Sequence, residues 1–292
     1  MISHFNNIDW HATDRCNLRC VACGHMCSLV DHTNNNTDRT PEDAERDFSI
    51  LYEKTNNGEY VDNISITGGE CTLNKHLPEI LDVAYKYFPN KISLWTNAIN
   101  LHLYTPELIQ RLQNYNITLH ITIYNKVHEP NINTFLNINN LYAILYNKSF
   151  DTNIADTTFF TKFFTEEPIP NNNNNLYCTS KFNCCQLKDQ KLYVCQYMGY
   201  LPYLFEYFGK EYADKIGYNN SSIYLDLTTV NNYEEIYNYV LNYNEDICAH
   251  CVDKWAIQDY DTRTKYRLVP WHTSNKQLNE WICKNVDEII KK

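Results

Sequence analysis

Three cysteines in one short stretch are the residues of this sequence best suited to bind a metal. Cys16, Cys20 and Cys23 form a CxxxCxxC pattern. Thiolates are soft ligands that favour zinc, copper(I) or iron–sulfur clusters. A structural zinc site needs four ligands, and three cysteines are one short of that number. The same three would hold a 4Fe–4S cluster and leave one iron open to a substrate, so the spacing favours a cluster that takes part in chemistry.

A second candidate site follows a short apolar strand. Residues 64–67 lead directly into Gly68, Gly69 and Glu70. Glycines let the backbone approach a ligand closely, because they carry no side chain. A carboxylate accepts charge-assisted hydrogen bonds from an ammonium group. The segment therefore predicts a binding site for a ligand with an amino group.

Together the two motifs resemble those of the radical S-adenosylmethionine (radical SAM) superfamily. Its CxxxCxxC pattern is matched by the three cysteines and its Gly-Gly-Glu by residues 68–70. The resemblance implies that the cysteines bind a 4Fe–4S cluster and that residues 68–70 receive the amino group of S-adenosylmethionine (SAM). The superfamily usually has an aromatic residue before the third cysteine, where this chain has Ala22. That departure affects the side-chain contact to the adenine and leaves the cluster ligands intact.

Length and composition narrow the class of protein. The chain has 292 residues, enough for one large α/β domain or one domain with a smaller module. A hydrophobic content of 43% supports a sizeable core, and a net charge of -10 argues against nucleic acid as a partner. No stretch has the pattern of a signal peptide or enough apolar sequence to cross a bilayer. With twelve cysteines in metal-ligand spacings, the sequence predicts a protein of the reducing cytoplasm with no membrane partner.

The first half of the chain alternates strand-like and helix-like patterns. Apolar runs and turn residues predict strands at residues 8–12, 63–67, 91–96 and 117–123, with a fifth near 151–160. Helical periodicity and capping residues predict helices after Thr40, Lys75 and Thr105, and a weaker one over residues 132–146. Such alternation predicts a parallel sheet with helices outside. The resemblance then implies an incomplete (β/α)6 barrel of the TIM type over residues 1–170, with the active site at the carboxyl ends of the strands.

Alternation within the strand at 117–123 predicts which side chains face the interior. Its apolar residues share one face and should pack under the helices, so His120 and Thr122 point inward. The same parity turns Trp95, Asn97 and His11 inward from their own strands. In the radical SAM superfamily a polar residue near the end of the fourth strand contacts the ribose of SAM, and Thr122 matches it best. Asn97 and Thr122 therefore join the predicted cofactor-binding residues, against the alternative of ordinary interior polar side chains.

A second group of cysteines follows an asparagine-rich link near residue 171. Spacing favours four of them as thiolate ligands of another metal centre: Cys178, Cys195, Cys248 and Cys251. Cys184 and Cys185 compete for the first place, and a structural zinc is the alternative to a second 4Fe–4S cluster. Residues 171–292, which end in a helix after Ser274, resemble the twitch type of auxiliary-cluster module, a short relative of the SPASM domain. That module prefers glycine where this chain has Gln190.

Two further cysteines lie beside the first two motifs. Cys27 follows the CxxxCxxC pattern and Cys71 follows the Gly-Gly-Glu segment. A free cysteine behaves as a small apolar residue and is among the most often buried types. We interpret both as buried core residues that bind no metal.

The resemblance implies a concrete reaction. The first cluster, reduced by a donor such as flavodoxin or ferredoxin, would cleave SAM to a 5′-deoxyadenosyl radical that abstracts a hydrogen atom from a substrate carbon. The second cluster would accept an electron from the substrate radical, which gives a net two-electron oxidation. Candidates for the base that removes the accompanying proton are Tyr124, Lys162 and His120.

The substrate class rests on weaker patterns. Only fifteen residues precede Cys16, which argues against the leader-binding domain common in peptide-modifying relatives. The chain also resembles short radical SAM proteins of saccharide pathways, so we expect oxidation or epimerisation of a sugar-like or other small polar metabolite. Modification of a peptide or protein residue is the first alternative. A non-catalytic iron–sulfur or zinc-binding protein is the second, and the intact motifs argue against it.

Overall fold

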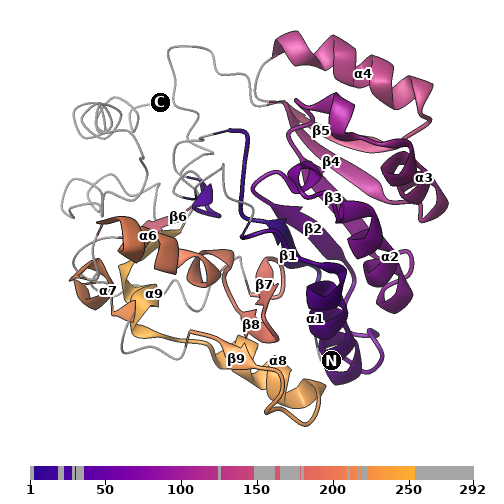
Figure 1. Ribbon diagram of the computed structural model, residues 1–292. Coiled ribbons are helices and arrows are strands. Elements are labelled where there is room, and N and C mark those ends of the chain that lie inside the picture. The colour runs from indigo at the N-terminus through magenta and orange to yellow at the C-terminus, as the bar shows by residue number, and fades with distance from the viewer. Residues whose placement is uncertain are drawn as a thin grey trace.

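The protein is built on one sheet of eight strands in the order β5-β4-β3-β2-β1-β7-β8-β9 (Figure 1). The computed structural model describes residues 3–18, 23–27, 30, 36–123, 126–147, 162–164, 178, 181–208, 211–215, 217–218 and 223–253. Each of the first six strands in this order, from β5 through β1 to β7, runs parallel to its neighbours. The last two are antiparallel: β8 pairs with β7, and β9 pairs with β8. The fold is therefore α/β with a mostly parallel sheet.

The first half of the chain alternates strand and helix as predicted. Its elements are β1 (Ile8–Thr13), α1 (Pro41–Lys54), β2 (Ile64–Gly68), α2 (Leu77–Tyr87), β3 (Ile92–Thr96), α3 (Pro106–Asn114), β4 (Thr118–Ile123), α4 (Glu129–Ile138) and β5 (Ala143–Asn147). Local chemistry sets the helix starts. Thr40 and Asp43 form a capping box with a proline at the first position of α1, and Thr105 caps α3 in front of another proline.

The second half adds shorter elements. They are β6 (Lys162–Phe164), β7 (Cys185–Lys188), β8 (Lys191–Tyr193), α6 (Leu201–Phe208), α7 (Glu211–Lys215), β9 (Leu225–Asp226), α8 (Tyr233–Asn242), α9 (Asp246–His250) and β10 (Cys251–Asp253). Strands β7 to β9 extend the main sheet at β1, whereas β6 and β10 form a separate pair. None of the helices in the described part of the chain is long and apolar enough to cross a membrane. The helix predicted after Ser274 lies outside the described residues.

The fifth strand corrects the sequence prediction. A helix was expected over residues 132–146 and a strand near 151–160, but α4 ends at Ile138 and β5 covers Ala143–Asn147. Asn140 adopts a left-handed conformation (φ 48°), and the Leu141 N–H then bonds the Leu136 carbonyl at 3.0 Å. Asparagine tolerates this conformation, so an Asn-Asn pair stops the helix. The residues of the predicted strand lie outside the described part of the chain.

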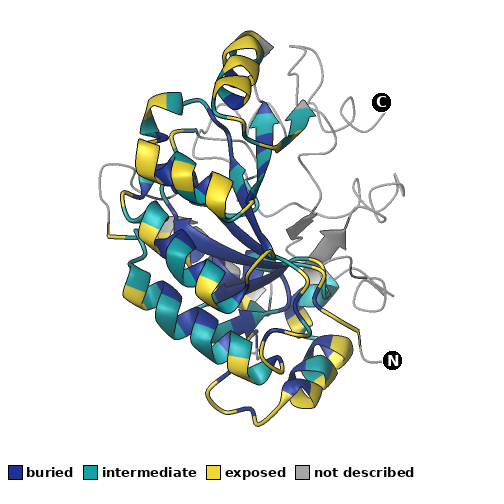
Figure 2. Cartoon of the chain, turned by 90° about the vertical axis from the view of Figure 1, so that its right-hand side faces the viewer, coloured by how far each residue is buried: buried dark blue, intermediate teal, exposed yellow. Residues whose placement is uncertain are grey.

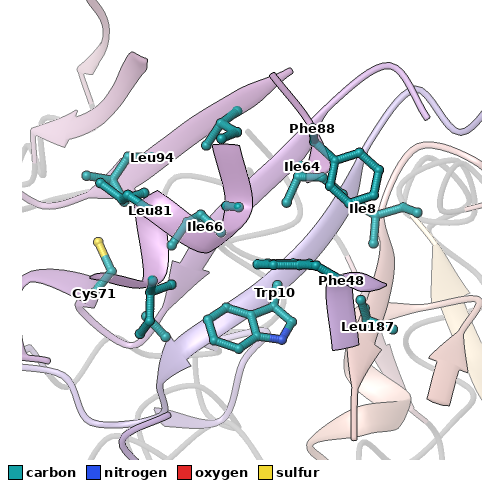
Figure 3. Close-up of a cluster of buried hydrophobic side chains, with 14 of the residues drawn as sticks. Ile8, Trp10, Phe48, Ile64, Ile66, Cys71, Leu81, Phe88, Leu94 and Leu187 are labelled. Atoms are coloured by element: carbon teal, nitrogen blue, oxygen red, sulfur yellow. The ribbon is translucent and has the colours of Figure 1, made fainter. Parts of the chain in front are cut away.

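The apolar core lies between the sheet and its helices. Figure 2 shows buried strands behind a row of helices whose outward turns are exposed. In Figure 3 the side chains of Ile8, Ile64 and Leu94 point from the strands toward Phe48 and Leu81 of the helices, and all five are fully buried. Trp10 packs on Phe48 with ring centroids 5.1 Å apart. This core fixes the alternation of each strand, so the opposite face carries the other side chains.

The hairpin β7–β8 is tied to α1 by one buried carboxylate. Asp189 and Gln190 form its turn, both with positive φ (52° and 61°). Their N–H groups donate to Asp47 at 3.2 and 2.9 Å, and Trp10 Nε1 donates to the same carboxylate at 3.0 Å. A left-handed turn residue explains why glycine is preferred at the position of Gln190. Asp47 thus joins the residues after 180 to the first half of the chain.

Candidate functional site

Backbone hydrogen bonds join the Gly-Gly-Glu turn to the segment that leads into the cysteine motif. The Gly69 N–H donates to the Thr13 carbonyl at 2.9 Å, and the Glu70 N–H to the Arg15 carbonyl at 2.8 Å. A Cβ atom added to Gly68 or Gly69 would lie 2.1 or 2.0 Å from these same two oxygens. Only glycine permits so close an approach. The two predicted motifs therefore meet at the carboxyl ends of β1 and β2.

An ion pair holds the start of the cysteine loop. Arg15 donates to Asp38 through Nε at 2.9 Å and through a terminal nitrogen at 2.6 Å, and that nitrogen also bonds the Leu73 carbonyl at 2.9 Å. Thr13 Oγ1 donates to the same carboxylate at 2.6 Å. A two-pronged arginine–carboxylate pair fixes orientation as well as distance. Cys16, the next residue, leaves the sheet from an anchored point.

The cysteines of the first motif have an environment that suits thiolates. Cys16 Sγ accepts the Leu18 N–H at 3.4 Å. A hydrogen bond from the Cys27 thiol lowers the pKa of Cys23 to about 7. The backbone N–H groups of residues 25–27 also lower this pKa, whereas burial opposes the shift. N–H and S–H donors around sulfur and a stabilised thiolate fit an iron–sulfur cluster. Cys20, the third predicted ligand, lies outside the described residues.

Glu70 is a buried carboxylate held by the protein itself. It is 1% exposed, and burial raises its pKa while hydrogen bonds oppose the shift. Oε1 accepts from Thr72 Oγ1 and Thr96 Oγ1, both at 2.7 Å, and Oε2 accepts the Asn97 N–H at 2.7 Å. Among the described residues Oε2 accepts this single bond, and a carboxylate has about four acceptor positions, so Oε2 has a position for one more donor. Glu70 therefore ties together the loops after β2 and β3, and one oxygen remains suited to an ammonium.

Asn97 and Thr122 lie at the ends of neighbouring strands. Asn97 Nδ2 donates to Asn17 Oδ1 at 2.7 Å, directly beside Cys16, so this predicted residue belongs to the same group as the two motifs. Thr122 is half-buried near the end of β4 and pairs with Tyr146 of β5. The alternation expected in β4 is confirmed, since Leu119, Ile121 and Ile123 are buried and the residues between them are half-buried. The role of Thr122 at a ribose stays a prediction.

Sequence reasoning missed a buried polar network beneath the cysteine loop. His11 Nδ1 bonds Asp14 at 2.6 Å and its Nε2 bonds His25, two residues past Cys23. Tyr200 stacks on His11 with centroids 4.0 Å apart, and Tyr203 donates to Asp14 at 2.5 Å. Burial alone would raise the pKa of Asp14, but the hydrogen bond and charge of His11 hold it below its ordinary value. The inward parity of His11 was predicted, whereas its tyrosine partners come from a distant segment that no local pattern connects to it.

The second cysteine group is partly described. Burial lowers the pKa of Lys181, and the electrostatic interaction of this lysine with Cys178 and Cys248 opposes that shift. Tyr243 Oη is buried and has no hydrogen-bond partner among the described residues. Burial raises the pKa of Tyr243, and electrostatic interaction with Cys248 and Cys195 adds to that shift. A buried donor beside several thiols fits a group that carries acceptor atoms. Within the described ranges, however, no three histidine, cysteine or acidic side chains are close enough to hold a metal.

The two competing cysteines face opposite sides of the sheet. Cys184 Sγ lies 3.4 Å from Asp9 and 3.2 Å from Gln196, on the side away from the helices. Cys185 is fully buried in the apolar core, and burial raises its pKa far above the ordinary value. Cys251 opens β10 opposite Phe164, and its side chain is outside the description. The ligand set Cys178, Cys195, Cys248 and Cys251 stays a prediction.

The remaining residues predicted from the sequence are two further cysteines and three candidate bases. Cys27 and Cys71 are buried, as expected, and Cys71 Sγ donates to the Trp95 carbonyl at 3.1 Å. His120 is half-buried and burial lowers its pKa. Tyr124 and the side chain of Lys162 lie outside the described residues, so the choice of base among these three stays a prediction.

The sequence matches no family model and no curated protein. Among solved structures, the chain is similar to SuiB of Streptococcus suis bound to S-adenosylmethionine, with 12% identity and a TM-score of 0.39 over 66% of this chain and 60% of SuiB. It is similar to anSMEcpe with bound AdoMet, with 17% identity and a TM-score of 0.35 over 48% of this chain and 43% of that one. SuiB bound to the precursor peptide SuiA gives 14% identity and a TM-score of 0.33, over 51% of this chain and 40% of SuiB. The chain spans 40% to 60% of these proteins, and similarity at this level carries no functional argument.

Proposed function

We propose that the protein is a radical SAM enzyme whose first three cysteines hold a 4Fe–4S cluster beside the Gly-Gly-Glu turn. The observation that carries the proposal is the backbone contact between the two motifs. Gly69 and Glu70 donate to the carbonyls of Thr13 and Arg15, directly before Cys16. Two motifs with separate chemical roles, a thiolate site and an amino-group acceptor, are thereby held at one place.

The residues of the chain divide the work of binding. When bound, the reduced cluster supplies the electron that cleaves SAM to a 5′-deoxyadenosyl radical. Glu70 would accept the amino group of SAM at Oε2, its less occupied oxygen. Asn97, bonded to Asn17 beside the cysteines, would orient the loop against the ligand, and Thr122 would contact the ribose. The protein contributes position and exclusion of water.

The proposed net reaction is the oxidation or epimerisation of a small polar metabolite. It is supported by the thiols near Lys181 and Tyr243, which suit a second cluster that accepts an electron. Residues 1–170 would form the partial barrel and residues 171–292 the twitch-like module. We further propose flavodoxin or ferredoxin as electron donor. We propose the reducing cytoplasm as location, because thiols stay reduced there.

Metal content and SAM cleavage test the proposal. Anaerobically reconstituted protein is expected to bind about eight irons, as two 4Fe–4S clusters. Replacing Cys16, Cys20 and Cys23 by alanine should halve the iron and abolish formation of 5′-deoxyadenosine after reduction with dithionite. Cys71→Ala, which removes a buried thiol outside both groups, is the matched control for the iron content alone, because Cys71 Sγ lies 3.9 Å from Glu70 Oε1. A single zinc with no SAM cleavage would mean that the protein is a metal-binding protein and no enzyme of this class.

A further inference from the structure

The face of the sheet turned away from the helices is unusually polar. From β1 to β4 its side chains are those that alternate with the apolar core: Asp9, His11, Thr13, Ser65, Thr67, Ser93, Trp95, Thr118, His120 and Thr122. We call this set the inner face. Closed barrels of the TIM type fill the interior with bulky branched aliphatic side chains, and no aliphatic side chain lies on the inner face of β1 to β4. Polar groups here need partners, either from the protein or from a ligand.

The part of the inner face on β1 and β2 supplies its own partners. Asn63 Nδ2 donates to Asn7 at 2.6 Å, Ser93 at 2.9 Å and Ser65 at 3.1 Å, and Ser65 Oγ donates to Asn7 at 2.7 Å. Ser65 and Ser93 are buried. This end is a closed hydrogen-bonded network, so a ligand would have to bind elsewhere on the inner face.

The part on β3 to β5 is half-buried and aromatic. The rings of Trp95 and His120 stack at 4.5 Å and 18°, and Tyr146 lies within 5.3 Å of Trp95 at 17°. Tyr146 Oη and His120 Nδ1 are 2.9 Å apart, and Trp95 Nε1 donates to Ser65 at 3.2 Å. We call these three rings the aromatic platform. Hydrogen bonds hold their near-parallel arrangement, so the platform is built before any ligand arrives.

The platform lies directly below the candidate site. His120 precedes Thr122 by two residues in β4, so the two share one face of that strand. Trp95 lies two residues before Asn97, which directly follows β3. A strand rises about 3.3 Å per residue, which sets the platform about 7 Å from the strand ends where the two motifs meet. A small molecule resting on the platform would reach toward those ends.

The chemistry of the platform defines its ligand. His120 stacks on one face of Trp95, so the half-buried indole can take the apolar face of another ring only on its remaining surface. The Thr118 and Thr122 hydroxyls and His120 Nε2 are hydrogen-bonding groups on the same face of the sheet. On β3 to β5, the described inner-face residues include no lysine, arginine or carboxylate, and burial lowers the pKa of His120 and so favours its neutral form. A phosphate or carboxylate on the ligand would find no cation among these described residues.

We propose that the aromatic platform binds the substrate and that the substrate is a neutral polyhydroxylated ring, a sugar or cyclitol without phosphate or carboxylate. The proposal deepens the proposed function and, as a statement about a substrate, rests on it. Ring hydroxyls would meet the threonines and His120, while a face of C–H groups stacks on Trp95.

Saturation-transfer NMR on the full-length reconstituted protein tests the platform. The probes are myo-inositol and methyl α-D-glucopyranoside, compared with glucose 6-phosphate and the tripeptide Gly-Ser-Gly. Transfer to the two neutral rings is expected, with little to the phosphate or peptide. Trp95→Ala should weaken binding about tenfold, the effect of losing one aromatic contact. Tyr224→Ala, which removes an exposed ring near β9, should leave binding unchanged.

His120→Ala is the second variant, because it removes a half-buried ring and keeps the larger Trp95 in place. It should also weaken binding of the neutral rings if the protein melts as the wild type does. No transfer to either neutral ring, stronger transfer to the phosphate or peptide, or equal binding by all variants would overturn the proposal. Binding needs no SAM cleavage, so a protein that binds the rings without cleaving SAM would refute only the radical SAM function. A protein that cleaves SAM and binds neither ring would refute only the platform.

Discussion

At the scale of single residues, a carboxylate predicted to bind a ligand also organises the protein. Glu70 accepts hydrogen bonds from three residues on two loops and is almost fully buried. Alanine at this position would leave several buried donors without an acceptor, each costing about 1–3 kcal/mol. A test of ligand binding therefore has to preserve the shape of the side chain.

Glu70→Gln is expected to weaken SAM binding by at least about tenfold with unchanged iron content. The variant keeps the volume and one carbonyl oxygen but removes the charge, and hydrogen bonds to charged groups contribute about 1.5–3 kcal/mol. Equilibrium dialysis with SAM, beside an iron assay, measures both quantities. Glu59→Gln, on the surface between α1 and β2, is the control. An unchanged SAM affinity would show that the Gly-Gly-Glu turn does not receive the amino group.

Asp9 makes a pH-dependent contribution to stability. Burial raises its pKa to about 6, opposed by hydrogen bonds from Asn7 and Cys184. Between the two pKa values the folded state holds a proton that the unfolded chain has lost. The contribution of Asp9 to the free energy of unfolding is therefore largest below about pH 4 and falls as the pH rises to about 6. In Asp9→Asn this fall should shrink by about 3 kcal/mol.

Urea denaturation of the metal-free protein at several pH values measures the effect of Asp9. Asp62→Asn, which changes a half-exposed carboxylate, should keep the wild-type slope. Parallel curves for wild type and Asp9→Asn between pH 4 and 6 would contradict the prediction, because a carboxyl with an ordinary pKa contributes no slope in that range.

At the scale of elements, the β7–β8 hairpin depends on a helix far away in the sequence. Asp47 of α1 accepts the two N–H groups of the turn and the Trp10 indole N–H. Arg46 adds a hydrogen bond at 3.1 Å to the same carboxylate. The hairpin pattern is visible in the sequence, but its docking depends on a buried side chain of another element.

Asp47→Ala should destabilise the protein by more than about 3 kcal/mol, because the four donors named above lose the acceptor that they share. Asp47→Asn, which keeps one acceptor oxygen, should cost less. Urea denaturation compares both variants with Glu53→Ala, a change at an exposed position of the same helix. If Asp47→Ala unfolds at the wild-type urea concentration, the turn is not held by this carboxylate.

At the scale of the whole molecule, the two cysteine groups belong to one continuous structure. Strands β7 to β9 extend the sheet that carries the first motif. A Cβ atom on Gly24, next to Cys23, would lie 3.1 Å from Tyr197 Oη and 3.2 Å from Gln196 Nε2, two residues that follow Cys195. The segment that follows Cys23 therefore contacts the segment that follows Cys195.

Cys195→Ala separates two roles of the second group. If a cluster there accepts an electron, 5′-deoxyadenosine should still form, because its machinery lies in the first two motifs, while oxidised product disappears. If the metal only braces the fold, both should fall together with the soluble yield, since thiolate-bound metals contribute to folding. Liquid chromatography of both products beside a melting curve distinguishes them. Normal product from soluble protein without the second cluster would rule out the acceptor role.

The sequence by itself determined the local structure of the first half and the two motifs. Helix caps and strand alternation depend on neighbours a few residues away, so local patterns predict them. The same reasoning extended the helix after residue 132 too far, through residues that form β5, because an Asn-Asn helix stop is a weak signal beside apolar periodicity.

Tertiary structure alone decided why the motif needs two glycines, which partners surround His11 and which carboxylate lies beside Cys184. Each depends on atoms contributed by distant segments: the carbonyls of Thr13 and Arg15, the ring of Tyr200 and the carboxylate of Asp9. Such contacts follow from the path of the whole chain and the register of its strands. A single sequence carries no periodic signal for them, since side-chain periodicity reports only the face on which a residue lies.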